Sequence, residues 1–389
     1  MNQKSRPWVK RILVTAALAA MTAGVMVPAH AADSQRPVGD IRVFTTFGYP
    51  GTPGGLAVNG QTLYVDTSAG NIDRQFDGSD NLYAYNVDTR QQLGQPIDVK
   101  RQYPVAPMGL AGIALDAAGR LYIADMNGRI DRVDPRTGVQ EVYSVVPAGT
   151  DTSAPDMPTF VVFDHAGNLY VGDAGGDPII WRVPPGGGTA KPWFVDPRLA
   201  GTWAASVLGM TIDPTGHDLY FATGNQEPGI VIYRLPLDHP DSAHLEEFHR
   251  YGDLVTSPCN PTPSGAFLSC SGTQVAGAGG IAFGASGKLY VVLLAKNQVS
   301  ILQPDGTEAL RFPSPQDNAK LDVPVNAPFD LAFDGHGTLL VSQLGDATFG
   351  NGPGNTPPPG GQQQAKNWVV YDVWVNDTAA PLNRPAIAS

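Results

Sequence analysis

The amino-acid sequence predicts an all-β protein, a six-bladed β-propeller of four-stranded antiparallel blades whose ring is closed by the N- and C-terminal strands. Three observations lead to this prediction: a hairpin pattern that occurs six times, turn residues spread along the chain, and a spare strand near the beginning. The 45 glycines and 35 prolines suit many short strands that are joined by tight turns. Long helices are not expected.

Each copy of the hairpin pattern has a short apolar strand, a turn and a second strand that usually begins with Leu-Tyr. The copies are GLAVNGQTLYVD (55–66), GIALDAAGRLYIAD (112–125), FVVFDHAGNLYVGD (160–173), GMTIDPTGHDLYFATG (209–224), GIAFGASGKLYVV (280–292) and DLAFDGHGTLLVS (330–342). They recur about every 50 residues, a period that indicates a propeller or a solenoid. Four of the turns have Asp followed three residues later by Gly, which is the chemistry of a type I turn.

A third strand follows each hairpin, and most third strands lead through a Pro/Gly turn into a fourth, more polar strand such as 139–146. Four antiparallel strands repeated in this way form the radial blades of a propeller. The last repeat has only three strands, whereas the strand 41–47 precedes the first hairpin. We therefore expect 41–47 to complete the sixth blade beside 368–376, which removes exposed sheet edges.

Residues 1–31 have the organisation of a secretory signal peptide. Basic residues precede the apolar run 12–27, and Ala29-His30-Ala31 fits a cleavage site. The apolar run is shorter than the ~20 residues of a membrane-spanning helix. We expect an exported protein, periplasmic or extracellular, with no membrane attachment after cleavage. A short linker (32–40) would then precede the propeller (41–376), and a C-terminal tail (377–389) would follow it.

Two irregular segments interrupt the repeats. The segment 346–366 is rich in Pro, Gly and Gln, and we expect a mobile loop there that is a candidate lid over the channel mouth. Cys259 and Cys270 lie in the Pro/Gly/Ser-rich stretch 256–273 with no His between or beside them. Because export places cysteines where disulfides form, we expect these two to pair.

The charge of the chain limits its partners. There are 36 Asp and Glu residues against 25 Lys and Arg, a net charge of −11, and the signal peptide removes no acidic residue. Such a surface excludes nucleic acid and anionic membranes as partners and favours a cation or a neutral ligand. The chain also has no phosphate-binding glycine pattern, so no organic cofactor is expected. A small molecule or a glycan at the channel mouth is the expected partner.

The geometry of a blade predicts where a site would lie. The start of the first strand and the end of the second strand lie at one rim of the ring, and the hairpin turns lie at the opposite rim. Ligand sites gather on loops at the channel mouth, so we place the site at the first rim. The turn rim then holds His165, His217 and His336, which are interpreted as turn residues.

Carboxylates at the candidate mouth suit a hard divalent cation, which takes oxygen ligands. Asp156 and Asp330 lie just ahead of or at the start of an inner strand. We take both as candidate metal ligands and Asp330 as the candidate catalytic residue. Asp125 and Asp173 recur at equivalent positions of two repeats, which favours a structural role for them.

The stretch 160–342, with LYVGD, IIWRVPPGGG, DPRLAG, GMTIDPTGHDLYFATG, GIAFGASGKLYVV and ILQPDG, resembles the gluconolactonase/regucalcin (senescence marker protein) family and neighbouring NHL-repeat propellers. The resemblance covers all six blades and rests on blade-building motifs. It implies hydrolysis of lactones or related esters with one divalent cation, calcium or zinc, in the channel. The positions that match the family's cation ligands hold Gly54, Thr159, Leu208 and Gly279 here. The chain therefore departs from the family pattern at each of them.

Three functional hypotheses follow. The first is a divergent cation-dependent lactonase or esterase, in which the metal polarises a carbonyl group and Asp330 activates water. The second is a non-catalytic propeller that binds a small ligand, a glycan or a protein at the mouth. The third is an enzyme that resembles streptogramin lyase or strictosidine synthase.

Overall fold

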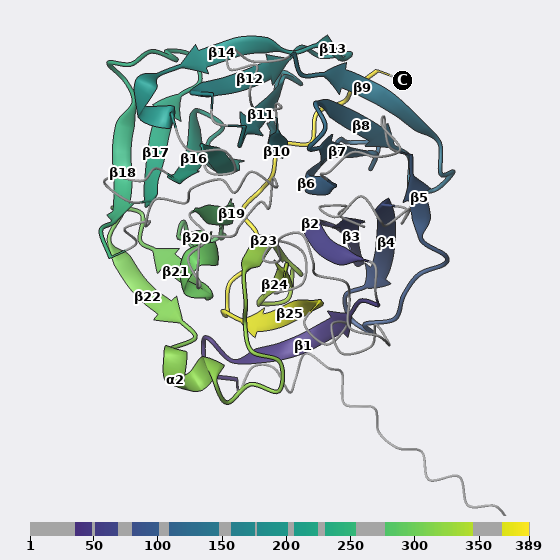
Figure 1. The fold of residues 1–389 in the computed structure, drawn as a ribbon, viewed down its shortest axis with the longest axis vertical. Helices are drawn as coiled ribbons and strands as arrows, with labels where there is room; N and C mark the ends of the chain where they lie inside the picture. The colour runs from purple at the N-terminus through teal and green to yellow at the C-terminus, as the bar shows by residue number, and fades with distance from the viewer. Residues whose placement is uncertain are drawn as a thin grey trace, which may run out of the picture.

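The computed structural model arranges six small β-sheets around a central axis (Figure 1). It describes residues 36–48, 51–68, 80–100, 109–147, 157–175, 177–200, 206–224, 230–253, 277–344 and 368–388. The segments 1–31 and 346–366 lie outside the described residues, as do Asp156, Cys259 and Cys270. The signal peptide, the mobile loop, the metal ligand and the disulfide that were expected there stay predictions. Within the described ranges, no helix has the length and apolar character needed to cross a membrane.

Each sheet is one blade with its first strand nearest the axis. Blade 1 holds β2 (Thr52–Asn59), β3 (Thr62–Ser68), β4 (Asp80–Asn86) and β5 (Ile97–Val99). Blade 2 holds β6 (Leu110–Leu115), β7 (Leu121–Asp125), β8 (Arg129–Val133) and β9 (Gln140–Val145). Blade 3 holds β10 (Pro158–Phe163), β11 (Leu169–Asp173), β12 (Ile179–Val183) and β14 (Lys191–Val195). The short β13 (Gly188–Thr189) joins the outer edge of blade 2 in parallel with β9.

The second half of the ring repeats this plan. Blade 4 holds β15 (Val207–Ile212), β16 (Asp218–Gly224), β17 (Ile230–Pro236) and β18 (Glu246–Tyr251). Blade 5 holds β19 (Ala278–Phe283), β20 (Leu289–Leu293), β21 (Gln298–Leu302) and β22 (Glu308–Phe312). Blade 6 holds β23 (Pro328–Phe333), β24 (Thr338–Gln343), β25 (Val369–Trp374) and β1 (Ile41–Thr46). The described residues also form three short helical turns: η1 (Pro197–Leu199), η2 (Leu294–Lys296) and α2 (Pro315–Asn318).

The N-terminal strand closes the ring, as the sequence predicts. Strand β1 pairs antiparallel with β25, and Ile41 lies opposite Val373. Just ahead of β1, the guanidinium group of Arg36 donates to the carboxylates of Asp40 (2.6 Å) and Asp372 (2.7 Å). Both ends of the chain thus build blade 6, and β1 forms its outer edge strand.

The hairpin turns have the predicted chemistry. The carboxylate of Asp116 accepts from the backbone N–H groups of Ala118 and Arg120, and Asp334 accepts from those of His336 and Thr338. The glycine at the end of these turns has a positive φ, for example 104° at Gly337, a region that glycine occupies at low cost. These contacts fix every such turn locally, without help from the rest of the ring.

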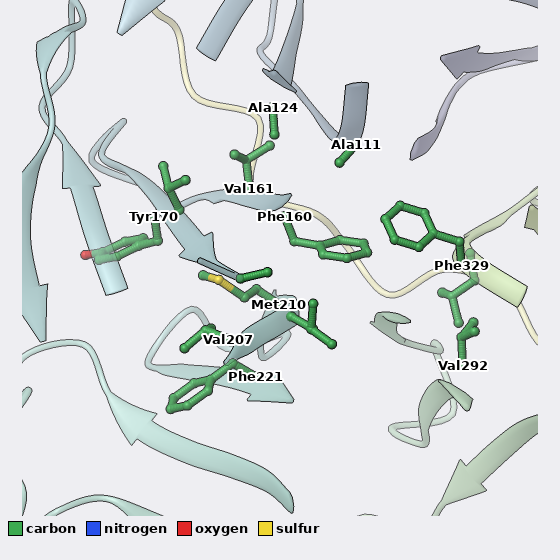
Figure 2. Packing of buried hydrophobic residues seen from close by; sticks show 14 of the residues in the cluster. Ala111, Ala124, Phe160, Val161, Tyr170, Val207, Met210, Phe221, Val292 and Phe329 are labelled. Carbon is green, nitrogen blue, oxygen red and sulfur yellow. The ribbon is translucent and has the colours of Figure 1, made fainter. Parts of the chain in front are cut away.

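Neighbouring inner strands approach each other closely at the axis. A Cβ atom placed on Gly209 of β15 would lie 1.9 Å from the carbonyl oxygen of Gly279 in β19. A Cβ atom on Gly279 would lie equally close, 1.9 Å, to the carbonyl oxygen of Phe329 in β23. No side chain fits at these two positions, so glycine is required where the blades converge. Apolar side chains such as Val161, Met210 and Phe221 fill the space between blades farther out (Figure 2).

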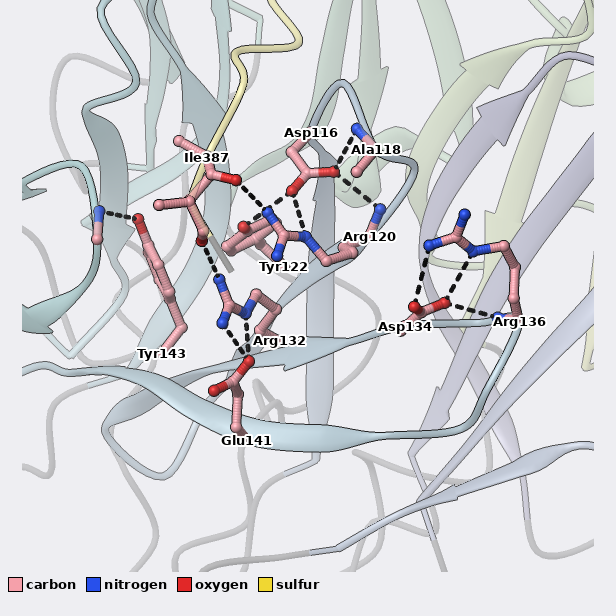
Figure 3. A network of polar contacts seen from close by, with 12 residues as sticks. Asp116, Ala118, Arg120, Tyr122, Arg132, Asp134, Arg136, Glu141, Tyr143 and Ile387 are labelled. Carbon is pink, nitrogen blue, oxygen red and sulfur yellow. Dashed lines mark hydrogen bonds and ion pairs between the residues drawn. The ribbon is translucent and has the colours of Figure 1, made fainter.

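The C-terminal tail runs across the turn rim of the ring, from blade 6 past the centre toward blade 2 (Figure 1). Ala380 donates its backbone N–H to the carbonyl of Phe283 in blade 5 (3.0 Å). At the other end of the tail, Arg120 donates to the carbonyl of Ile387 and Arg132 to that of Ala388 (Figure 3). The tail is therefore fastened to blades on opposite sides of the channel.

Candidate functional site

A cavity of about 310 Å³ lies at the centre of the ring. All six inner strands and the C-terminal tail contribute to its wall. The inner strands line it with small side chains at one equivalent position: Ala57, Ala114, Val162, Thr211, Ala282 and Ala332. In the sheet register, each of these residues lies opposite the second residue of the Leu-Tyr motif, which is Leu340 in blade 6. The repeat therefore creates the cavity, because it places a small residue toward the axis in every blade.

The cavity extends toward the hairpin turns. Its wall includes the turn residues Gly60, Asp334 and Gly335, together with Ala379 and Leu382 of the tail. From the blade geometry we expected the site at the opposite rim, whereas this cavity lies on the turn side of the ring. Many loops of the opposite rim lie outside the described residues. The sequence carries no repeat signal for the tail, so its part in the wall was not foreseen.

Asp330 is the buried acidic residue of the cavity wall. Its side chain lies in β23, and only 6% of the residue is exposed. One carboxylate oxygen accepts from the backbone N–H of Leu56 in blade 1 (2.8 Å), and the other accepts from that of Leu331 (2.7 Å). Burial raises the pKa of Asp330 to about 7, although both hydrogen bonds lower it. This carboxyl group therefore joins blade 6 to blade 1 through its hydrogen bond with Leu56. Its pKa lies near neutral pH.

A second buried carboxyl group lies beside this junction. Asp66 at the end of the second strand is fully buried, and one of its oxygens accepts from the backbone N–H of Gly55 (2.8 Å). The other oxygen has no hydrogen-bond partner. Burial raises the pKa of Asp66 well above its ordinary value, and the neighbouring charges of Asp330 and Asp80 raise it further. Asp66 is therefore a carboxyl group whose charged form is disfavoured by its surroundings.

Two aromatic rings occupy the axis where the inner strands begin. The ring centroids of Phe160 and Phe329 lie 5.3 Å apart, and the side chains point toward one another from blades 3 and 6 (Figure 2). Phe160 directly follows Thr159, a position at which the family resemblance places a cation ligand. Phe329 directly precedes Asp330, the candidate metal ligand. The structure thus puts an apolar contact beside these two positions.

The described residues do not fit the cation that the resemblance implies. Gly54, Leu208 and Gly279 have no side-chain oxygen, and the hydroxyl of Thr159 donates to the backbone carbonyl of Val207 (3.3 Å). Within the part of the chain that the structure describes, no three His, Cys, Asp or Glu side chains lie close enough to hold a metal ion. Whether Asp156 approaches Asp330 stays a prediction, because Asp156 lies outside the described ranges.

The residues interpreted as structural have structural contacts. Asp173 accepts from the backbone N–H groups of Met157 (3.0 Å) and Gly175 (2.7 Å) and from the indole N–H of Trp181 (3.0 Å). Asp125 pairs with Arg129 at 3.0 Å. These contacts confirm that the acidic residue after Leu-Tyr caps the end of a blade strand.

Arg384 is the cationic residue of the cavity wall, and sequence analysis missed it. Its guanidinium group donates to the side-chain oxygen of Asn59 (2.7 Å) and to the backbone carbonyl of Val58 (2.7 Å), both in blade 1. Burial lowers the pKa of Arg384, because a buried cation has lost part of its hydration. No motif marks this residue, and only the path of the tail brings it to the channel.

Comparison with solved structures identifies the same fold in proteins of different activities. A calcium-binding protein, regucalcin, from Agrobacterium tumefaciens is 15% identical, with a TM-score of 0.56 over 89% of this chain and 98% of that chain. A gluconolactonase from Xanthomonas campestris is 13% identical, with a TM-score of 0.52 over 86% and 89%. The PQQ-bound aldose sugar dehydrogenase from Streptomyces coelicolor is 18% identical, with a TM-score of 0.51 over 87% and 99%.

These likenesses confirm the expected regucalcin- and gluconolactonase-like fold. At such identities they show the fold alone, and function has to be argued from the site. No family model matches the chain, and no curated protein matches it either.

Proposed function

We propose that this gluconolactonase-like propeller is a binding protein, and that its central cavity takes up one small, largely apolar molecule. The observation that carries the proposal is the cavity itself, about 310 Å³ in volume and walled by side chains from all six blades, most of them apolar. Small-molecule sites are concave, mostly apolar and largely preformed, and this volume is at the lower end of their usual range. A ligand of two or three rings suits the space.

The surroundings of the cavity favour binding over catalysis. The oxygens of Asp330 already accept two backbone hydrogen bonds that join blades 6 and 1. A group that fixes the ring in this way cannot also be released to activate water without weakening that junction. The inner strands that surround the cavity are each hydrogen-bonded into a blade of the closed ring, so the cavity is held open before a ligand arrives.

Titration with the neutral fluorescent probe N-phenyl-1-naphthylamine tests this proposal. We expect saturable binding of one probe per chain, weakened at least tenfold by Ala332→Leu, which fills part of the cavity. Ala118→Leu is the matched control, because Ala118 is exposed in a hairpin turn and does not line the cavity. Binding that is absent, or that Ala332→Leu leaves unchanged, contradicts the proposal.

A lactone or ester hydrolase is the second candidate. The specific observation in its favour is that Asp330 lines the cavity and that burial raises its pKa to about 7, which is the range of a general base. The test is hydrolysis of simple lactones and aryl esters with and without chelator, comparing the wild type with Asp330→Asn. Loss of hydrolytic activity in the presence of chelator would support the cation-dependent mechanism with calcium or zinc. Loss with the substitution alone would support a cation-independent one.

Export and the disulfide are further proposals that rest on the sequence. N-terminal sequencing of the secreted protein should begin after Ala31 if residues 1–31 are a signal peptide. Thiol titration of the unreduced, unfolded protein should find no free thiol if Cys259 and Cys270 are paired. A retained N-terminus or two free thiols would contradict these proposals.

A further inference from the structure

We propose that the ligand of the central cavity carries an anionic head group, a carboxylate or a sulfonate, which Arg384 of the C-terminal tail binds. This inference rests on the proposed binding function and names the class of ligand: a small amphipathic anion with an apolar body. The whole chain is acidic, with a net charge of −11, so this preference is a property of the cavity and runs against the overall charge.

The contacts of Arg384 leave hydrogen-bonding capacity for a ligand. A guanidinium group has five N–H donors, and its two contacts here, with Asn59 and with the carbonyl of Val58, engage two of them. Both acceptors are uncharged. A planar fork of this kind matches the two oxygens of a carboxylate, or two of a sulfonate, in a bidentate contact.

Other arginines with buried or largely buried side chains show what Arg384 lacks. Arg36 lies against Asp40 and Asp372, Arg120 against Asp116, and Arg129 against Asp125 and Asp131. In the described part of the chain, no carboxylate forms an ion pair with Arg384. A partly buried cation without a counter-ion costs stability, and that cost is offset when an anion binds.

Two carboxyl groups also line the cavity, and neither is available to Arg384. The oxygens of Asp330 accept from two backbone N–H groups, and Asp334 accepts from the backbone N–H groups of His336 and Thr338. Burial raises the pKa of both, and backbone donors already occupy their oxygens. The polar groups of the cavity therefore favour an anion over a cation.

The remaining wall determines the rest of the ligand. Ala282, Ala332 and Val162 from the inner strands are apolar, as are Ala379 and Leu382 beside Arg384. A fully polar anion such as phosphate would lose hydration against these groups without replacement. An aromatic or branched aliphatic body would instead bury apolar surface against them.

Two probes that share an anilinonaphthalene body test the inference. 1-Anilinonaphthalene-8-sulfonate is anionic, and N-phenyl-1-naphthylamine is neutral. We expect the wild-type protein to bind the sulfonate at least tenfold more tightly than the neutral probe, and Arg384→Gln to reduce the ratio of the two affinities to about one. Arg384→Lys should retain part of the preference. Arg136→Gln, at an exposed ion pair with Asp134, is the matched control and should change neither affinity.

The salt dependence of wild-type binding gives a second readout that needs no variant. If Arg384 pairs with the sulfonate, added salt lowers the affinity for the sulfonate probe and leaves the affinity for the neutral probe unchanged. If no cation faces the sulfonate, the acidic protein repels it, and added salt strengthens its binding instead.

The outcomes separate the inference from the proposed function. If neither probe binds, the proposed function fails. If the neutral probe binds but the sulfonate is not preferred, or Arg384→Gln keeps the preference, the inference is overturned while the function stands. Asn59→Ala loosens the anchor of the tail and keeps the charge. If it removes the preference as fully as Arg384→Gln, Arg384 is only an anchor, which also overturns the inference.

Discussion

The carboxyl group of Asp330 in blade 6 accepts a hydrogen bond from the backbone N–H of Leu56 in blade 1, at 2.8 Å, and so joins the last hairpin of the ring to the first. Beside it, the hydroxyl of Ser342 donates to the carbonyl of Gly54 (2.6 Å). The pairing of β1 with β25 closes the ring at its outer edge, and these two contacts close it at the axis.

Asp330→Asn should destabilise the fold. The amide has one acceptor oxygen, so its NH₂ group would face one of the two backbone N–H groups that the carboxylate now satisfies. A buried donor without a partner costs roughly 1–3 kcal/mol in the free energy of unfolding. Urea unfolding measures this, with the exposed Asp98→Asn as a control that should change stability by less than about 0.5 kcal/mol. An unchanged midpoint for Asp330→Asn would refute the role of this contact.

The contribution of Asp330 to the stability of the protein should fall as the pH rises from about 4 to about 7. The folded-state pKa of Asp330 is raised to about 7 from 3.8, so over this window the folded state binds more protons than the unfolded state. Its contribution is fully present below pH 3.8 and is lost as the pH passes 7. The pKa of Asp66 is raised in the same direction. Denaturant unfolding at several pH values should show the decline, and a wild-type slope no steeper than that of Asp330→Asn would contradict this assignment.

Gly209→Ala should destabilise the ring strongly. Its Cβ atom would lie 1.9 Å from the carbonyl oxygen of Gly279, and that oxygen belongs to a backbone that cannot move away without shifting blade 5. Overpacking of this kind costs roughly 1–3 kcal/mol or more. Gly252→Ala is the control, because nothing lies within 4 Å of a Cβ atom there. Equal thermal midpoints for the two variants would show that the inner strands are less tightly packed than described.

Removal of residues 381–389 should weaken the binding of the neutral probe. The truncated chain loses Leu382 and Arg384 from the cavity wall, together with the contacts of the tail to blades 1 and 2. It keeps Asp377, which accepts from the hydroxyls of Ser286 and Tyr290 and fastens the preceding segment to blade 5. Fluorescence titration of the truncated protein checks this, after circular dichroism has shown that the sheets are intact. Unchanged affinity would mean that the tail does not form part of the site.

The blades could be predicted from the sequence because their information is local. A turn is determined by an Asp and a Gly within four residues, such as Asp116 and Gly119. A strand is determined by the alternation of apolar and polar side chains over about six residues. Ring closure was also predictable, since one strand was missing at one end and one was spare at the other. The candidate site was harder to predict from the sequence. Phe160 and Phe329 are in contact only because the ring brings blades 3 and 6 together. Nothing in the sequence near either residue predicts this contact.

The path of the C-terminal tail was the feature of the described structure that the sequence predicted least. Residues after β25 have no repeat pattern, and their path is set by individual contacts, such as that of Arg384 with Asn59, between residues far apart in the chain. Carboxylates at strand ends suggested a cation site because their backbone partners are not visible in a sequence. The structure shows such partners for Asp173 and Asp330.

The central claim is that the cavity at the axis is the binding site, and a crystal structure with bound N-phenyl-1-naphthylamine tests it most directly. The account predicts electron density for one probe among the small side chains of the inner strands, between Ala332 and Ala114, with Arg384 at its edge. Density only on the outer surface of the blades, or a cavity that stays without probe at saturating concentration, would contradict it.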